Sequence, residues 1–249
     1  RKGGGGVSVR SQAVNSRVGC SKVVGGGDES PVRRLLRELA GRLGGEYVGS
    51  SSYEPRCRHI VVEHTSRGGG ADLGSSRLIP AHLALQVVNV KRTEKLLAGL
   101  AAGAWLLKPS WAEASAAAGT WLPEEAHELF SAGEATAPCG RGLLWLGAPR
   151  AHRLARQERG GGVFVGQTFA LAPEVVPPPA QLRRIIEAGG GAVLEQGAPL
   201  REGAIAVVPD GADASHPLAS EATRAQASRV GPNELLGQLV GLGVASLAG

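Results

Sequence analysis

The chain has 249 residues, of which 43% are hydrophobic, so it can form one large domain or two of about 100 residues each. The formal net charge of +5 favours acidic partners, including phosphate, but is too dispersed to establish nucleic-acid binding. The three scattered cysteines exclude a disulfide framework, and the apolar runs are shorter than the roughly 20 residues that cross a bilayer. We therefore expect a soluble, intracellular protein with free thiols. Because it begins with Arg1, we also expect a fragment of a longer chain.

A strand, an amphipathic helix and two more strands are predicted first. The run "KVVGGG" (22–27) is typical of an apolar strand that ends in glycines. Ser30 caps the next helix, whose leucines share one face opposite arginines, and Gly44 and Gly45 end it. The runs "EYV" and "HIVVE" follow as strands, and the second is apolar enough to be buried in a parallel sheet.

An insertion precedes the next elements. We interpret residues 65–89 as a surface loop or a sequence-level artefact such as a retained intron. The runs "RTEKLLAGLAAG", "AWLL" and "PSWAEASAAAG" then predict a helix, a strand and a proline-led helix on which Trp111 anchors the core. Residues 131–162 form a linker in which "PRAHRLARQER" predicts a short basic helix.

The last third of the chain repeats this order, beginning with a strand in "VFVGQTFALAP". "PPPAQLRRIIEAGGGAVLE" aligns with the first helix and its strand at an offset of 146 (182 − 36), which places Leu182 over Leu36. A strand, helix, strand and helix follow in "AIAVVP", "LASEATRAQA", "SRV" and "PNELLGQLVGLG". Each half therefore has the order β-α-β-β-α-β-α, which predicts two copies of one small α/β domain at residues 18–130 and 163–249.

These residues resemble the BRCT domain, and the whole chain is similar to a tandem BRCT pair. In the first repeat the likeness lies in the helix closed by Gly-Gly, in "CRHIVVE" and in "RTEKLLAGLAAGAWLLKPSWAEAS". The second repeat is more divergent, with Glu234 where the family has its tryptophan. Within the family the first repeat most resembles the scaffold that localises the Smc-type repair complex to damaged chromatin, with checkpoint mediators and microcephalin as near alternatives. The resemblance implies a nuclear DNA-damage-response protein, each copy having a four-stranded parallel sheet with two helices on one face and one on the other.

The run "RTEK" carries the predicted site. Arg92 and Lys95 lie one turn apart at a helix start, where free backbone N–H groups favour a dianion and an ammonium adds charge-assisted bonds. Tandem BRCT pairs commonly bind phosphoserine peptides. The resemblance assigns phosphate binding to Lys95, a peptide-backbone contact to Arg92 and support of the lysine to Thr93. It also implies that Leu97 lines an apolar pocket between the domains.

The expected phosphate site departs from the family at the end of the first strand. Where the family has a Ser/Thr-Gly pair, this chain has glycines, so Gly25 and Gly26 can offer N–H groups but no hydroxyl. Losing that hydrogen bond costs about 1.5–3 kcal/mol. Asp28 and Glu29 would repel a dianion if they point inward.

Two other binding functions remain open. Arginines of the first helix and of the linker suit DNA phosphates, and they are Arg33, Arg34, Arg37, Arg150, Arg153, Arg156 and Arg159. A BRCT pair that docks an unmodified protein would also explain the missing Ser/Thr. Nothing predicts an enzyme, since nucleotide-binding and nucleophile motifs are absent and the histidines form no metal-ligand spacing. We expect no metal, no cofactor and no small-molecule substrate.

Overall fold

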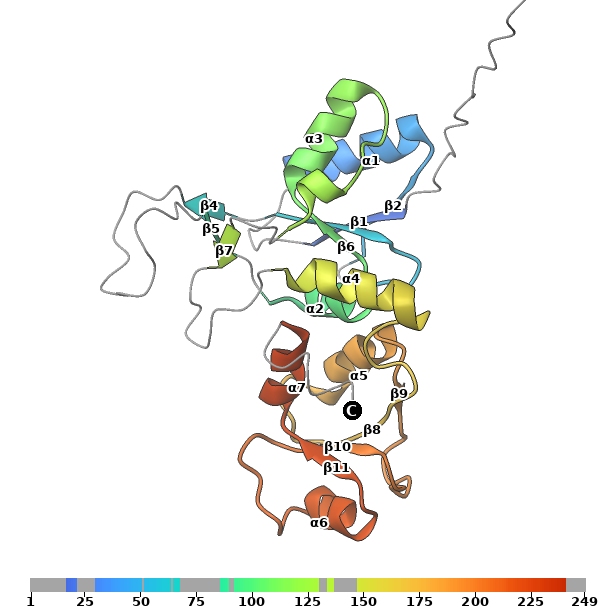
Figure 1. Cartoon of the computed structure of the whole chain (residues 1–249), viewed down its shortest axis with the longest axis vertical. Helices are drawn as coiled ribbons and strands as arrows, with labels where there is room; N and C mark the ends of the chain where they lie inside the picture. The colour runs from blue at the N-terminus through green and yellow to red at the C-terminus, as the bar shows by residue number, and fades with distance from the viewer. Residues whose placement is uncertain are drawn as a thin grey trace, which may run out of the picture.

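The computed structural model describes residues 17–21, 30–50, 52–63, 65–67, 86–89, 92–129, 134–136 and 147–240. In these ranges the chain forms two α/β units stacked end to end, with a small third sheet beside the first (Figure 1). Among the helices described, none has the length and apolar character needed to cross a membrane.

The first unit has the predicted order of elements. They are β1 (Arg17–Ser21), α1 (Pro31–Leu43), β2 (Glu46–Val48), β3 (His59–Val62), α2 (Glu94–Ala101), β6 (Trp105–Leu107) and α3 (Pro109–Ala118). Its four strands are parallel in the order β2-β1-β3-β6. Helices α1 and α3 cover one face and α2 covers the other, as predicted (Figure 1).

Local signals in the sequence explain where α1 begins and ends. The hydroxyl of Ser30 accepts a hydrogen bond from the Arg33 N–H at 3.3 Å, and this contact caps the helix. Gly44 has a φ of 78°, and the N–H of Gly45 donates to the Ala40 carbonyl at 2.8 Å. Only glycine adopts such a φ without strain, so the predicted helix end is confirmed.

The first strand lies earlier in the chain than predicted. Strand β1 ends at Ser21, and it pairs with both β2 and β3, whereas the prediction placed the strand at residues 22–27. Apolar character alone favoured "KVVGGG" over "RVGCS", but the pairing register with the neighbouring strands places residues 17–21 in the sheet. Gly25 and Gly26 lie outside the described residues.

The second unit repeats the first. Its elements are β8 (Thr168–Leu171), α5 (Pro179–Ala188), β9 (Ala192–Val193), β10 (Ile205–Val207), α6 (Pro217–Arg224), β11 (Ser228–Val230) and α7 (Pro232–Leu239). The strands are again parallel, in the equivalent order β9-β8-β10-β11. Leu36 and Leu182, which the offset of the repeat aligns, are both fully buried. The predicted fold class is therefore confirmed.

The insertion and the linker contain regular structure. Strand β4 (Thr65–Arg67) pairs antiparallel with β5 (Gln86–Asn89), and β5 pairs parallel with β7 (Glu134–Thr136) from the linker. The ends of the insertion are thus strands and not only a surface loop. The linker also contains α4 (Ala148–Arg159), which confirms the predicted basic helix, and a 3₁₀ helix (Glu125–His127) lies between α3 and β7.

Trp111 anchors α3 in the core of the first unit, as predicted. Its side chain is fully buried, it stacks on Trp121 at 4.9 Å between ring centroids, and its indole N–H donates to the Leu122 carbonyl at 2.8 Å. His59 also stacks on Trp111, at 5.3 Å between ring centroids. Such stacked aromatic groups bury a large apolar area, so they fix α3 and the segment after it on the sheet.

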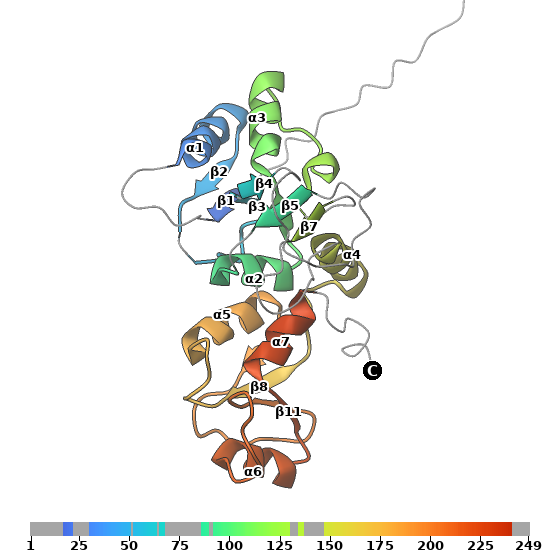
Figure 2. The same ribbon diagram turned by 90° about the vertical axis from the view of Figure 1, so that its left-hand side faces the viewer.

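The two units share one core. Helices α2, α4, α5 and α7 gather between the two sheets in both views (Figures 1 and 2). Every residue of α2 from Lys95 to Ala101 is buried, and the apolar cluster around α2 continues into α5, α7 and the second sheet. The N–H of Val163 donates to the Ala101 carbonyl at 3.0 Å, so the second unit begins directly against the end of α2.

Candidate functional site

Thr93 defines the start of α2. It has extended backbone angles, and its hydroxyl accepts a hydrogen bond from the Leu96 N–H at 3.2 Å, so it is the N-cap residue. Arg92 is exposed and precedes the cap. Arg92 therefore lies outside the helix, whereas Lys95 belongs to its first turn.

Lys95 is buried at the start of α2. Its side chain lies in the first turn of α2 and is 2% exposed, and its ammonium donates to the Ser50 carbonyl at 2.9 Å. A carbonyl accepts one of the three ammonium protons. Because an ionic interaction strengthens as the surrounding dielectric falls, an ammonium in this position attracts an anion more strongly than a solvated lysine does.

Cys57, whose thiol interacts electrostatically with Lys95, and its neighbour Tyr53 both stay neutral near pH 7. Burial raises the pKa of Tyr53 to about 12. Burial also raises the pKa of the Cys57 thiol, and the nearby Lys95 opposes that rise only in part. The Tyr53 hydroxyl donates to the Cys57 carbonyl at 3.4 Å.

The start of α2 also lies against the second unit. Glu94 accepts two hydrogen bonds from Arg184 of α5, Nε to Oε1 at 2.6 Å and Nη2 to Oε2 at 2.7 Å. Leu97 is 3% exposed and belongs to the apolar cluster that includes Leu182 and Leu235 of the second unit. Leu97 therefore lies between the units with its side chain already packed there, and its contact with a peptide stays a prediction.

Sequence reasoning missed Ser50 and Arg184. The run "SSS" after "EYVG" was visible, but only the folded sheet places it beside Lys95. Likewise, Arg184 is one of two adjacent arginines on α5, and only the stacking of the units shows that it pairs with Glu94.

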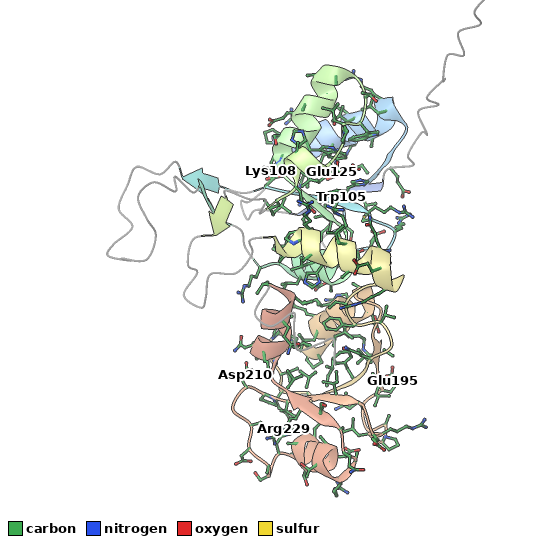
Figure 3. All side chains as sticks on the ribbon, in the orientation of Figure 1. Trp105, Lys108, Glu125, Glu195, Asp210 and Arg229 are labelled. Carbon is green, nitrogen blue, oxygen red and sulfur yellow. The ribbon has the colours of Figure 1, made fainter. Side chains whose placement is uncertain are left out.

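Two linker arginines are occupied by contacts within the fold. Arg153 pairs with Glu128, with 3.1 Å between Nη2 and Oε2, and its guanidinium lies 3.5 Å from the centre of the Trp105 ring. Arg156 donates to the Ala102 carbonyl at the end of α2. Figure 3 shows Trp105 near α4. The hypothesis of DNA binding therefore loses two of the four linker arginines on which it depended.

The buried histidine of the first sheet has a structural role. The Nε2 of His59 lies 2.8 Å from the Glu124 Oε1, and this contact is the largest cause of a lowered pKa at Glu124. Across the ranges that the structure describes, no group of three or more His, Cys, Asp or Glu side chains has the arrangement of a metal site.

Comparison with known proteins connects this geometry with a family. Residues 18–115 match the family model described as BRCA1 C Terminus (BRCT) domain. A BRCT domain-containing protein of Arabidopsis thaliana is 32% identical over 112 residues, which are 45% of this chain and only 8% of that protein.

Two solved structures have a similar fold over most of the chain. The BRCT5-BRCT6 domains of Brc1 from S. pombe have a TM-score of 0.50 at 14% identity, with 91% of this chain and 92% of that chain covered. Rtt107p, solved in complex with a phosphorylated histone, also has a TM-score of 0.50, at 12% identity, with 94% and 90% covered. At such low identity the likeness shows the fold alone. The first unit thus matches the BRCT family in sequence, and the two units together have a fold similar to that of tandem BRCT modules.

Proposed function

We propose that the chain is a non-catalytic scaffold module that binds a phosphoserine-containing segment of another nuclear protein in the DNA damage response. The observation that carries this proposal is the place of Lys95, a buried ammonium in the first turn of α2, where the two units meet. The similar fold of Rtt107p, solved with a phosphorylated histone, supports it. Among such scaffolds we favour one that localises an Smc-type repair complex, because of the run "KLLAGLAAGAWLL".

The chemistry of the helix start suits a phosphate dianion. The first N–H groups of a helix have no acceptor within the helix, and the helix dipole adds partial positive charge there. Thr93 satisfies one of these N–H groups, and the ammonium of Lys95 adds a full charge. Charge-assisted hydrogen bonds are about twice as strong as neutral ones, so a phosphate held here gains more than an unmodified serine.

The interface between the two units lies at the start of α2, next to Lys95. The Glu94–Arg184 pair and the apolar contacts of Leu97 hold the second unit against α2. We propose that a peptide whose phosphate binds Lys95 continues across this interface. Exposed Arg92 then contacts the peptide backbone, and Leu97 supports the side chain downstream of the phosphoserine.

Fluorescence anisotropy with a phosphorylated histone peptide and a phosphoserine peptide library tests the proposal. We expect Lys95→Ala to lose about 2–5 kcal/mol of binding free energy, because it removes one partner of a buried charge pair. Arg229→Ala is the matched control: Arg229 is an exposed cation of β11 in the second unit (Figure 3), and its removal leaves binding unchanged. Equal binding by wild type and Lys95→Ala would contradict the proposed site.

A further inference from the structure

Ser50 lies at the edge of the sheet where the start of α2 also lies. It follows β2 by two residues, and β2 runs parallel to β1 with Val48 opposite Gly19. Because the strands are parallel, their carboxyl ends meet at one edge, which is where open α/β sheets bind ligands. The hydrogen bond from Lys95 to the Ser50 carbonyl places this serine directly beside the ammonium.

The hydroxyl of Ser50 is oriented by the backbone. The N–H of Ser52 donates to the Ser50 Oγ at 3.2 Å, so this oxygen already serves as an acceptor. A serine hydroxyl carries one proton of its own, which then points to a different acceptor. Ser50 is partly exposed, and its carbonyl lies 2.9 Å from the buried ammonium of Lys95.

We propose that Ser50 is a phosphate ligand of the site, with its hydroxyl donating to one phosphate oxygen while Lys95 binds another. The assignment rests on the proposed function. It supplies a hydroxyl from the segment that follows β2, on the residue whose carbonyl accepts from Lys95. The carbonyl of Ser50 holds the ammonium, and the side chain of Ser50 contacts the ligand, so one residue has both tasks.

The test compares three variants with wild type, using the tightest phosphoserine peptide from the library and its unphosphorylated form. We expect Ser50→Ala to weaken binding of the phosphorylated peptide by about ten- to a hundredfold, as for a lost hydrogen bond to a charged group. Ser50→Thr keeps a hydroxyl and retains most of the affinity. Ser52→Ala keeps the backbone N–H and its contact with Ser50, so it serves as the matched control and binds like wild type.

The possible outcomes separate this assignment from the proposed function. If wild type binds the phosphorylated peptide and Ser50→Ala binds it equally well, the assignment is overturned while the proposed function stands. If wild type binds the phosphorylated and unphosphorylated peptides with equal affinity, both the assignment and the proposed function are overturned. A loss of stability in Ser50→Ala is recognised by the ratio of affinities for the two peptides, since a general loss of structure weakens both and a lost phosphate ligand weakens only the phosphorylated one.

Discussion

Gly162 lies at the junction of the two units, where a larger side chain would clash with the backbone. A Cβ atom on Gly162 would lie 2.6 Å from the Gly189 carbonyl oxygen and 2.7 Å from the Ala101 carbonyl oxygen. Both atoms belong to the backbone, so neither can move aside as a flexible side chain can. Gly41, on the exposed side of α1, has nothing within 4 Å of its Cβ position.

We expect Gly162→Ala to lower the free energy of unfolding by about 2 kcal/mol or more, because the methyl group forces the second unit away from α2. Gly41→Ala is the control and raises it by about 0.5–1 kcal/mol, since alanine favours a helix interior. Chemical denaturation measures both. Equal effects of the two substitutions would contradict the close approach at Gly162.

His152 makes stability depend on pH. It is buried on α4, its Nε2–H donates to the Leu239 carbonyl at 2.8 Å, and burial lowers its pKa below the usual 6.5. The folded state therefore holds the neutral form, while the unfolded chain gains a proton near pH 6.5. Stability from this group is complete above that pH and is lost as the pH falls below it.

Denaturation at a series of pH values tests whether the free energy of unfolding falls as the pH falls. We expect the free energy of unfolding of wild type to fall between about pH 7 and pH 5.5, from the usual histidine pKa downward. His152→Gln keeps a donor for the Leu239 carbonyl and shows a smaller fall. His127, whose pKa is also lowered by burial, is present in both proteins and cancels in the comparison. Identical pH profiles would show that His152 does not contribute.

At the scale of elements, the features that depend on local sequence were predicted better than those that depend on long-range contacts. The sequence predicted the helix caps at Ser30 and Gly44 and the repeat of apolar faces, because each depends on residues close together in the chain. It did not predict the position of β1 or the sheet formed by β4, β5 and β7, since the partners of these strands are distant in sequence. For the same reason the sequence predicted Lys95 as a site residue but could not predict its contact with Ser50.

Helix α2 forms an ion pair with the second unit, between Glu94 and Arg184. Arg184 is 44% exposed, so solvent weakens the pair, and we expect a coupling free energy of about 0.5–1 kcal/mol between Glu94 and Arg184. A double-mutant cycle with Glu94→Gln and Arg184→Gln measures it. The neighbouring Arg183, which pairs with Glu187 and Glu195, is the control and shows no coupling with Glu94. Equal coupling to both arginines would contradict the observed pairing.

At the scale of the whole molecule, the two units share one continuous apolar core. Figure 1 shows α1 and α3 at one end and α6 at the other, with α2 enclosed between the sheets. The apolar cluster passes from Ile60 of the first sheet through Leu97 and Leu182 to Phe169 of the second. Units that share a buried apolar interface lose stability when they separate, so they are expected to unfold together.

We predict a single cooperative unfolding transition. The four tryptophans all precede the second unit in sequence, so their fluorescence reports the first unit and the linker, whereas far-UV circular dichroism reports the helices of both units. The two probes should give coincident midpoints in denaturant. Separate midpoints would show that the second unit folds independently of α2.

The most direct measurement is the affinity of the intact chain for one phosphoserine peptide before and after phosphatase treatment, at two salt concentrations, beside a 5′-phosphorylated DNA duplex. We predict phosphate-dependent peptide binding with a shallow salt dependence, because one buried ammonium and a few fixed groups hold the ligand. Equal affinity for the treated and untreated peptide would contradict the phosphate site and favour docking of an unmodified protein. Tighter binding of the duplex with a steep salt dependence would instead indicate contacts to the DNA backbone.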